Sequence, residues 1–232
     1  MDWMNAGADA DAFAEIKNTS LGKLVRDHLL AQIMAGTLQP GQALREPELV
    51  EQMQVSRVPV REALRELESM GLVVSRKHSG VYIRELSSEE VHDLYQFRAL
   101  MDNHAGRMTT QLPAEKRQEL IDKLLPCISA MDEAIESDNT QAYYNANLQF
   151  HWLFIQYAGN REIAKSYREV IQKLHLARVK NLSTNEHRRQ SNMEHKQIVR
   201  ALQDANSIAG ATHCAELLAH HVINAHGRLA EM

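Results

Sequence analysis

The stretch Gln54–Gly71 reads QVSRVPVREALRELESMG, and the first part of the chain is organised around it. Its apolar residues follow the i, i+3, i+4, i+7 spacing of a single buried stripe on a helix. These residues are Val60, Ala63, Leu64 and Leu67. Ser56 stands where a helix N-cap is expected, and Pro59 is tolerated only in a first turn. The stretch therefore predicts a short amphipathic helix.

Three arginines lie away from the apolar stripe of this predicted helix. Arg57 and Arg61 are four residues apart and Arg65 follows one turn later, so the three share neighbouring faces. Arginine can donate two hydrogen bonds to guanine O6 and N7 in the DNA major groove, and it also pairs with phosphates. An ordinary amphipathic helix with a solvated basic edge has the same pattern, so the neighbouring segments must decide between the two interpretations.

Two further helices are predicted before this stretch. Ser20 is a suitable N-cap for a helix that runs to Gly36. The apolar stripe of that helix consists of Leu21, Leu24, Val25, Leu29 and Ile33. A proline–glycine turn then leads to a second short helix, Leu44–Met53, which can hold Pro47 only in its first turn.

A basic β-hairpin is predicted after the stretch. The run Leu72–Ile83 reads as two strands joined by the turn Arg76–Gly80. Three helices and such a hairpin make a winged helix-turn-helix, whose hairpin tip approaches the minor groove or a phosphate. We therefore assign DNA contacts to the second and third helices and the hairpin tip, at Arg45, Ser56, Arg57, Arg61, Arg65, Lys77, His78 and Gly80.

The charge balance excludes a protein that is coated in basic surface. The 232 residues carry a formal net charge of −4, and residues 20–85 contain nine Lys/Arg against eight Asp/Glu. A DNA-binding patch must therefore come from arginines that are collected on one face of the domain, with the glutamates on the others.

The cysteines and the apolar runs of the sequence indicate the cellular compartment in which the protein works. Its two cysteines, Cys127 and Cys214, have neither metal-type spacing nor a disulfide framework, which suits a reducing cytosol. The acidic opening lacks the features of a signal peptide, and no apolar run is long enough to span a bilayer. We expect a soluble cytoplasmic protein without membrane partners.

From Ser87 onward the pattern is helical to the end of the chain. The predicted helices are 88–110, 113–136, 140–158, 161–181, 186–204 and 208–229. Six helices around one core form an all-α bundle domain. We thus predict a mostly α protein with a flexible tail (1–19), an N-terminal winged helix-turn-helix domain (20–85) and an all-α helical-bundle domain (86–232).

Three blocks of the sequence carry a family resemblance: GTLQPGQALREPELVEQMQVSRVPVREALRELESMGLV, LQFHWLFIQYAGN and EHKQIVRAL. Through them the chain resembles the GntR transcription regulators, in the FadR-type branch with the FCD ligand-binding domain, over residues 20–229. The resemblance implies a homodimer that binds a palindromic double-stranded DNA operator and that is released from DNA or, in some members, held more tightly on it by a small-molecule effector. We expect this protein to be a repressor. The chain departs from the family pattern at Pro47, Gln54 and Val58, where arginine, glycine and threonine are usual.

The resemblance also implies a divalent metal site in the helical domain. The family pattern is an Asp or Asn, a histidine four residues on, and two histidines from later helices, which match Asn147, His151, His195 and His221. His220 is the alternative to His221 as the last ligand. Three imidazoles and an oxygen suit zinc or nickel and leave positions for water or an effector carboxylate. The amide of Asn147 lacks the charge of a carboxylate ligand.

The same resemblance places Arg98 at the ligand pocket. Its guanidinium could pair with an effector carboxylate. A structural salt bridge with Asp102, one turn further on, is the alternative interpretation.

Three functions are compatible with these patterns. The leading one is a ligand-responsive DNA-binding regulator without enzymatic activity. A second is a DNA-binding protein whose helical domain serves only dimerisation. A third is a metal-dependent hydrolase that uses the histidines, but the sequence lacks an HExxH-type glutamate beside them, and a hydrolase has no need of the winged-helix block.

Overall fold

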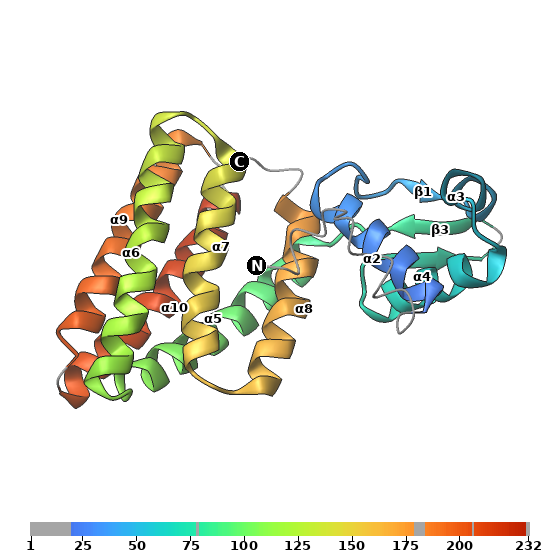
Figure 1. Ribbon diagram of the computed structural model, residues 1–232. Coiled ribbons are helices and arrows are strands. Elements are labelled where there is room, and N and C mark those ends of the chain that lie inside the picture. The colour runs from blue at the N-terminus through green and yellow to red at the C-terminus, as the bar shows by residue number, and fades with distance from the viewer. Residues whose placement is uncertain (1–19, 78, 179–183, 206, 231–232) are drawn as a thin grey trace. The chain divides into compact units, whose positions relative to one another are not determined.

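The computed structural model describes residues 20–77, 79–178, 184–205 and 207–230 (Figure 1). They divide into two compact units. The described residues up to Ser87, together with Ile171–Arg178, belong to the N-terminal unit, and the remaining described residues belong to the C-terminal unit. The tail predicted over residues 1–19 lies outside the described residues.

The N-terminal unit combines short helices with a small antiparallel sheet. Its elements are α2 (Leu21–Met34), β1 (Ala43–Leu44), α3 (Glu46–Met53), α4 (Arg57–Ser69), β2 (Val73–Arg76) and β3 (Gly80–Ile83). The sheet order is β1-β3-β2, so that β3 is central. The predicted hairpin is confirmed, with Val74 of β2 opposite Tyr82 of β3. Helices followed by a hairpin form the expected winged helix-turn-helix.

Strand β1 is a feature that the sequence interpretation missed. Leu44 was expected to begin the second helix, but it pairs with Val81 of β3 and its side chain is buried. The backbone is still extended at Arg45, and α3 begins only at Glu46, with Pro47 in its first turn. The strand forms because pairing with β3 is available, and the proline sets the earliest start of the helix that follows.

The apolar stripe of α4 is buried as predicted. Its residues, Val60, Ala63, Leu64 and Leu67, join a core that includes Val25, Leu29 and Ile33 of α2. The predicted stripe of α2 also included Leu21 and Leu24, but their side chains are exposed. Leu21 is the first residue of α2 and Leu24 lies on the adjacent face, where the neighbouring elements leave the side chain in contact with solvent.

The turn between α3 and α4 depends on Gln54. This residue adopts a left-handed conformation with φ 53° and ψ 41°. Residues other than glycine adopt this conformation at a cost of roughly 1–2 kcal/mol, because their Cβ crowds the backbone. Its side chain Nε2 donates a hydrogen bond to the carbonyl oxygen of Glu51 at 2.7 Å. The chain therefore keeps the sharp turn without the usual glycine. Ser56 takes the N-cap position of α4 without a side-chain capping hydrogen bond.

The C-terminal unit is helical at the described positions. Its helices are α5 (Ser88–Thr110), α6 (Ala114–Glu136), α7 (Thr140–Tyr157), α8 (Arg161–Arg178, of which the last turns belong to the other unit), α9 (Asn185–Gln203) and α10 (Ile208–Ala230). These bounds agree with the predicted helices within a few residues, although the predicted end of the fourth helix at 181 lies outside the described residues. Among the described residues, no helix combines the length and apolar character needed to span a bilayer.

Helix α7 is enclosed by its neighbours. It packs against α6 on one side and α5 on another, while α10 packs against α5 and α9 (Figure 1). Its side chains are buried on several faces, at Tyr143, Asn147, Leu148, Phe150, His151, Trp152, Leu153, Phe154 and Ile155. Polar side chains on such a helix lie inside the bundle, where they must find partners.

Candidate functional site

Three histidines from three helices come together inside the C-terminal unit. His151 of α7, His195 of α9 and His221 of α10 are all buried. Each offers a ring nitrogen, and these nitrogens lie within 4.8 Å of one another. The ring centroids are 4.2 Å apart for His195 and His221 and 5.0 Å apart for His151 and His221. The cluster therefore has the composition and the compactness of a metal site.

Two carboxylates set the orientation of two of these imidazoles. His151 Nδ1 lies 2.7 Å from Asp102 Oδ1, and His221 Nδ1 lies 2.7 Å from Glu194 Oε2. A carboxylate accepts the hydrogen bond, so we infer that Nδ1 carries the proton in both rings. The Nε2 lone pair then remains available, as a metal ligand requires.

Glu194 is itself held firmly. Arg228 donates to both carboxylate oxygens of Glu194, at 2.9 and 3.0 Å, and Asn224 adds a hydrogen bond at 3.1 Å. Burial would raise the pKa of Glu194, but the hydrogen bonds from His221 and Arg228 outweigh it and lower that pKa to about 2. The carboxylate is therefore ionised at neutral pH and fixed opposite His221.

Several buried polar atoms of these histidines and of Asn147 lack a hydrogen-bond partner within the described part of the chain. They are Nε2 of His151, both ring nitrogens of His195 and Oδ1 of Asn147. Asn147 is buried and lies four residues before His151 on α7. A buried polar group without a partner costs about 1–3 kcal/mol, and one divalent cation would satisfy several of these atoms together. The residues present therefore fit a metal ion.

Burial also keeps these imidazoles in the protonation state that coordination requires. Desolvation lowers the pKa of His151 to about 4, against the pull of Asp102 in the opposite direction. Desolvation likewise lowers the pKa of His195 and of His221 below the ordinary histidine value. Neutral imidazoles at neutral pH can bind a cation without first releasing a proton.

Arg98 lies beside this cluster and is almost completely buried. Its Nε donates to the Tyr167 hydroxyl at 3.1 Å and lies 3.5 Å from Asp102 Oδ2. Desolvation opposes the charge of Arg98, but Tyr167 and Asp102 raise the pKa of the guanidinium. Nη2 has no hydrogen-bond partner among the described residues. The salt bridge between Arg98 and Asp102, which was the alternative interpretation of Arg98, is present. Nη2 of Arg98 remains as a further donor.

The sequence interpretation missed part of this arrangement. It noted Asp102 only as a possible partner of Arg98, and it did not select Glu194 or Tyr167. Glu194 is adjacent to His195 in the sequence but binds His221, 27 residues further on, so local spacing does not reveal its role. His220 is exposed and lies outside the cluster.

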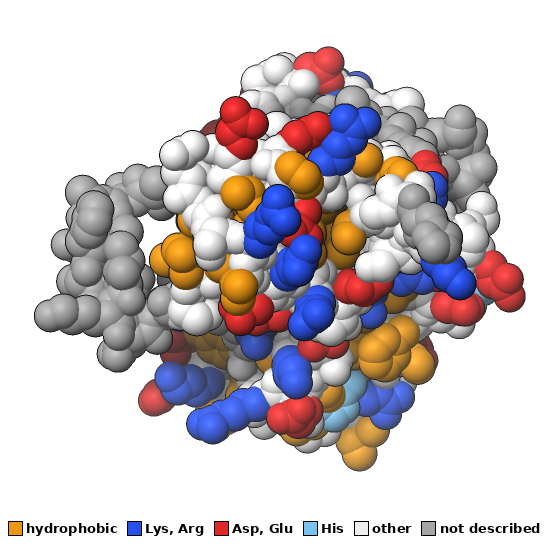
Figure 2. Space-filling model, turned by 90° about the vertical axis from the view of Figure 1, so that its right-hand side faces the viewer, with side chains coloured by type: hydrophobic (Ala, Val, Ile, Leu, Met, Phe, Trp, Pro, Cys, Tyr) orange, Lys and Arg blue, Asp and Glu red, His pale blue; other side chains and the backbone are white. Residues whose placement is uncertain are grey.

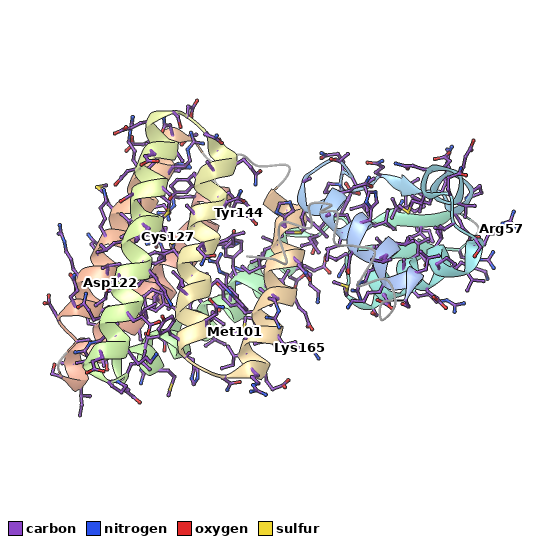
Figure 3. All side chains as sticks on the ribbon, in the orientation of Figure 1. Arg57, Met101, Asp122, Cys127, Tyr144 and Lys165 are labelled. Carbon is purple, nitrogen blue, oxygen red and sulfur yellow. The ribbon has the colours of Figure 1, made fainter. Side chains whose placement is uncertain are left out.

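The predicted recognition helix presents its arginines to solvent. Arg57, Arg61 and Arg65 are exposed on α4, and Figure 3 shows Arg57 projecting outward from the N-terminal unit. Arg61 Nε donates to Glu46 Oε2 at 2.8 Å, which leaves both Nη nitrogens to donate elsewhere. Arg45 precedes α3 and pairs with Glu48 at 3.0 Å.

The hairpin tip supplies further basic and backbone groups. Lys77 and Gly80 are exposed. Gly80 has a φ of 103°, a conformation that favours glycine, and an added Cβ there would meet no atom of the described residues within 4 Å. The Arg76 guanidinium lies 4.5 Å from the centroid of the Tyr82 ring. His78 lies outside the described residues. Figure 2 shows basic side chains interspersed with acidic and apolar ones on the face in view.

Comparison with known protein families identifies both units. Residues 21–83 match the family described as "Bacterial regulatory proteins, gntR family". Residues 93–220, more than half of the chain, match the FCD domain.

Individual relatives and solved structures agree with these matches. The HTH-type transcriptional regulator YdhC of Bacillus subtilis is 28% identical over 196 residues, which are 84% of each chain. A protein of Paenarthrobacter nicotinovorans described as "Probable D-xylose utilization operon transcriptional repressor" is 29% identical over 152 residues, 66% of each chain. The structure of E. coli McbR/YncC covers 90% of this chain and 98% of its own, with a TM-score of 0.70; at 19% identity it supports the fold alone.

These relatives are regulators of transcription and not enzymes, which removes the hydrolase interpretation. The winged helix-turn-helix with its exposed arginines and the helical domain with its histidine cluster agree with the two family matches. The chain belongs to the GntR family of bacterial regulatory proteins, in the group that carries an FCD domain, and it is a DNA-binding transcriptional regulator.

Proposed function

We propose that this regulator is a repressor that binds a palindromic operator as a homodimer and senses a small carboxylate at a metal-containing pocket. The observation that carries this proposal is that His151, His195 and His221 bring ring nitrogens within 4.8 Å of one another inside the helical domain. Among the described residues, Nε2 of His151 and both ring nitrogens of His195 have no hydrogen-bond partner. A domain that served only dimerisation would gain nothing from leaving these groups unsatisfied. The description of the Paenarthrobacter relative as a repressor supports the direction of regulation.

The proposed metal ligands are Asn147, His151, His195 and His221. Three imidazoles and an amide oxygen favour zinc, with nickel as the alternative. The bound cation would offer its remaining coordination positions to a carboxylate. Asp102 is the residue through which the metal ligands and the effector contact would communicate, because one of its oxygens contacts His151 and the other faces Arg98.

The proposed effector contact is Arg98. A buried guanidinium whose Nη2 has no partner among the described residues is suited to a planar, anionic acceptor, and a carboxylate matches its geometry. An effector that bridged the metal and Arg98 would engage α5 together with the helices of the histidine cluster. Such a ligand favours whichever arrangement of these helices binds it more tightly, and this difference in affinity is what can release DNA.

A second copy of the chain is proposed to dock on the outer face of α5. Phe97 and Leu100 are 47% and 70% exposed on this helix, and Met108 continues the apolar line. In an antiparallel pairing of two α5 helices about Leu100, Asp93 of each copy lies opposite Arg107 of the other, because both are seven residues from Leu100. Apolar contact at the centre with opposite charges at both ends makes this face complementary to itself.

The first prediction concerns operator recognition by α4. Replacing Arg57 or Arg61 with alanine should weaken operator binding by about 1–3 kcal/mol for each lost bidentate base contact. Affinity is measured at one fixed salt concentration, on DNA selected from a random pool by the full-length protein. Arg161→Ala, which removes an arginine from the start of α8, is the charge-matched control and should bind as the parent does. Parental affinity in both α4 variants, with the fold intact, would contradict the assignment.

The second prediction concerns the metal. His195→Ala should abolish stoichiometric binding of zinc or nickel, and Glu194→Gln should weaken it by about 10–100-fold because the support of His221 is lost. His220→Ala is the matched control, since that neighbouring histidine is exposed, and it should retain the parental metal content. Elemental analysis and metal titration of protein purified without chelators give the values. A parent protein that takes up neither metal at neutral pH would refute the site and favour the interpretation that the helical domain only dimerises.

The third prediction concerns the effector. Among organic acids and sugar acids, those that bind should raise the thermal unfolding temperature of the metal-loaded protein, because they stabilise the native state. The corresponding amides should not do so. Arg98→Lys keeps the charge beside Asp102 but removes the planar donor pair, so it should lose most of the shift while retaining metal. An equal shift in parent and variant would show that Arg98 does not hold the carboxylate.

The fourth prediction concerns the dimer. Leu100→Glu should convert the dimer to monomer at micromolar concentration, because two buried carboxylates would meet at the centre of the interface. Leu125→Glu alters another exposed leucine, on α6, and should leave the dimer intact. Sedimentation equilibrium distinguishes the outcomes: identical association of both variants would place the interface elsewhere.

A further inference from the structure

Val58 places an apolar side chain among the arginines of α4. It lies in the first turn of the helix and is 63% exposed. Successive residues of a helix are rotated by about 100°, so Val58 shares a face with Arg61 and Arg65 and lies opposite Leu67. Leu67 is completely buried. Val58 therefore stands at the part of the helix surface that is farthest from the core.

Helix stability does not explain valine at this position. Valine forms helices less readily than most residues, because its branched Cβ restricts χ1. The exposed side chain also contributes little to packing within the unit. The same restriction is an advantage for recognition, since a side chain that is already fixed loses little entropy when it contacts a ligand.

The chemistry of the side chain limits what it can contact on DNA. Valine neither donates nor accepts hydrogen bonds, so it gains nothing from phosphates or from the polar edges of bases. The apolar group that a base pair presents in the major groove is the C5 methyl of thymine. Residues at the start of a recognition helix are those that reach base edges, and Val58 lies between Arg57 and Arg61 there.

We propose that Val58 is a specificity-determining residue that contacts the C5 methyl group of a thymine in each operator half-site. The thymine lies beside the bases or phosphates that Arg57 and Arg61 contact. This inference rests on the proposed operator recognition, and it adds the identity of a base to it. The contact is apolar and requires the methyl group itself, not the hydrogen-bonding edge of the base.

A double-mutant cycle between protein and DNA tests this contact. The operator is first selected from random double-stranded DNA with the full-length protein. Each thymine of a half-site is then replaced in turn by deoxyuridine, which pairs in the same way but lacks the methyl group. At one position this change should weaken binding of the parent by about 3–5-fold, as expected for one buried methyl group. At that position it should not weaken binding of Val58→Ala.

Arg57→Ala provides the comparison variant. It should lose affinity by the same factor on the thymine and the deoxyuridine operators, because its contact does not depend on the methyl group. Half-sites without thymine, or equal losses for parent and Val58→Ala at every thymine, would overturn the inference and leave operator binding intact. A selection that yields no preferred sequence would overturn the operator proposal, and this inference with it.

Discussion

The hydrogen bonds from His151 to Asp102 and from His221 to Glu194 are the interactions on which the helical domain's site depends. An imidazole has two ring nitrogens, and only the one that carries no proton can bind a metal ion. By accepting a hydrogen bond from Nδ1, each carboxylate leaves Nε2 without a proton. The two bonds also join separate helices, Asp102 on α5 to His151 on α7 and Glu194 on α9 to His221 on α10. The contacts that define the tautomers therefore also hold the bundle around the site.

Removing the carboxylates of Asp102 and Glu194 from water costs free energy, and further hydrogen-bond and ion-pair partners offset that cost. Glu194, whose side chain is partly buried, accepts hydrogen bonds from Arg228 and Asn224 in addition to the one from His221. Asp102 lies between His151 and Arg98, and Arg98 in turn donates to Tyr167. Among the described residues, Nη2 of Arg98 and both ring nitrogens of His195 still have no hydrogen-bond partner. A cation and a carboxylate are the two ligands that would complete them.

Most of the fold could be predicted from the sequence because its helices follow from the local spacing of apolar residues. The stripe of Val60, Ala63, Leu64 and Leu67 and the six later helices need only a 3.6-residue period. Strand β1 could not be predicted in this way, since a two-residue strand exists only through its pairing with β3. The same holds for Glu194, whose partner is distant in the sequence. His221 could have been preferred over His220 by period alone, because it continues the buried series Cys214 and Leu218 at i+4 and i+7.

Anomalous X-ray diffraction from crystals of the full-length protein, recorded at the zinc or nickel edge, is the most direct test of this arrangement. We predict one ion, bound about 2.0–2.1 Å from Nε2 of His151 and Nε2 of His221, with His195 as a further ligand. The Nδ1 atoms of the first two rings should still donate to Asp102 and Glu194. An ion bound through Nδ1 of His151 or His221, or no anomalous peak at the cluster after crystals are soaked in both metals, would contradict the proposed site.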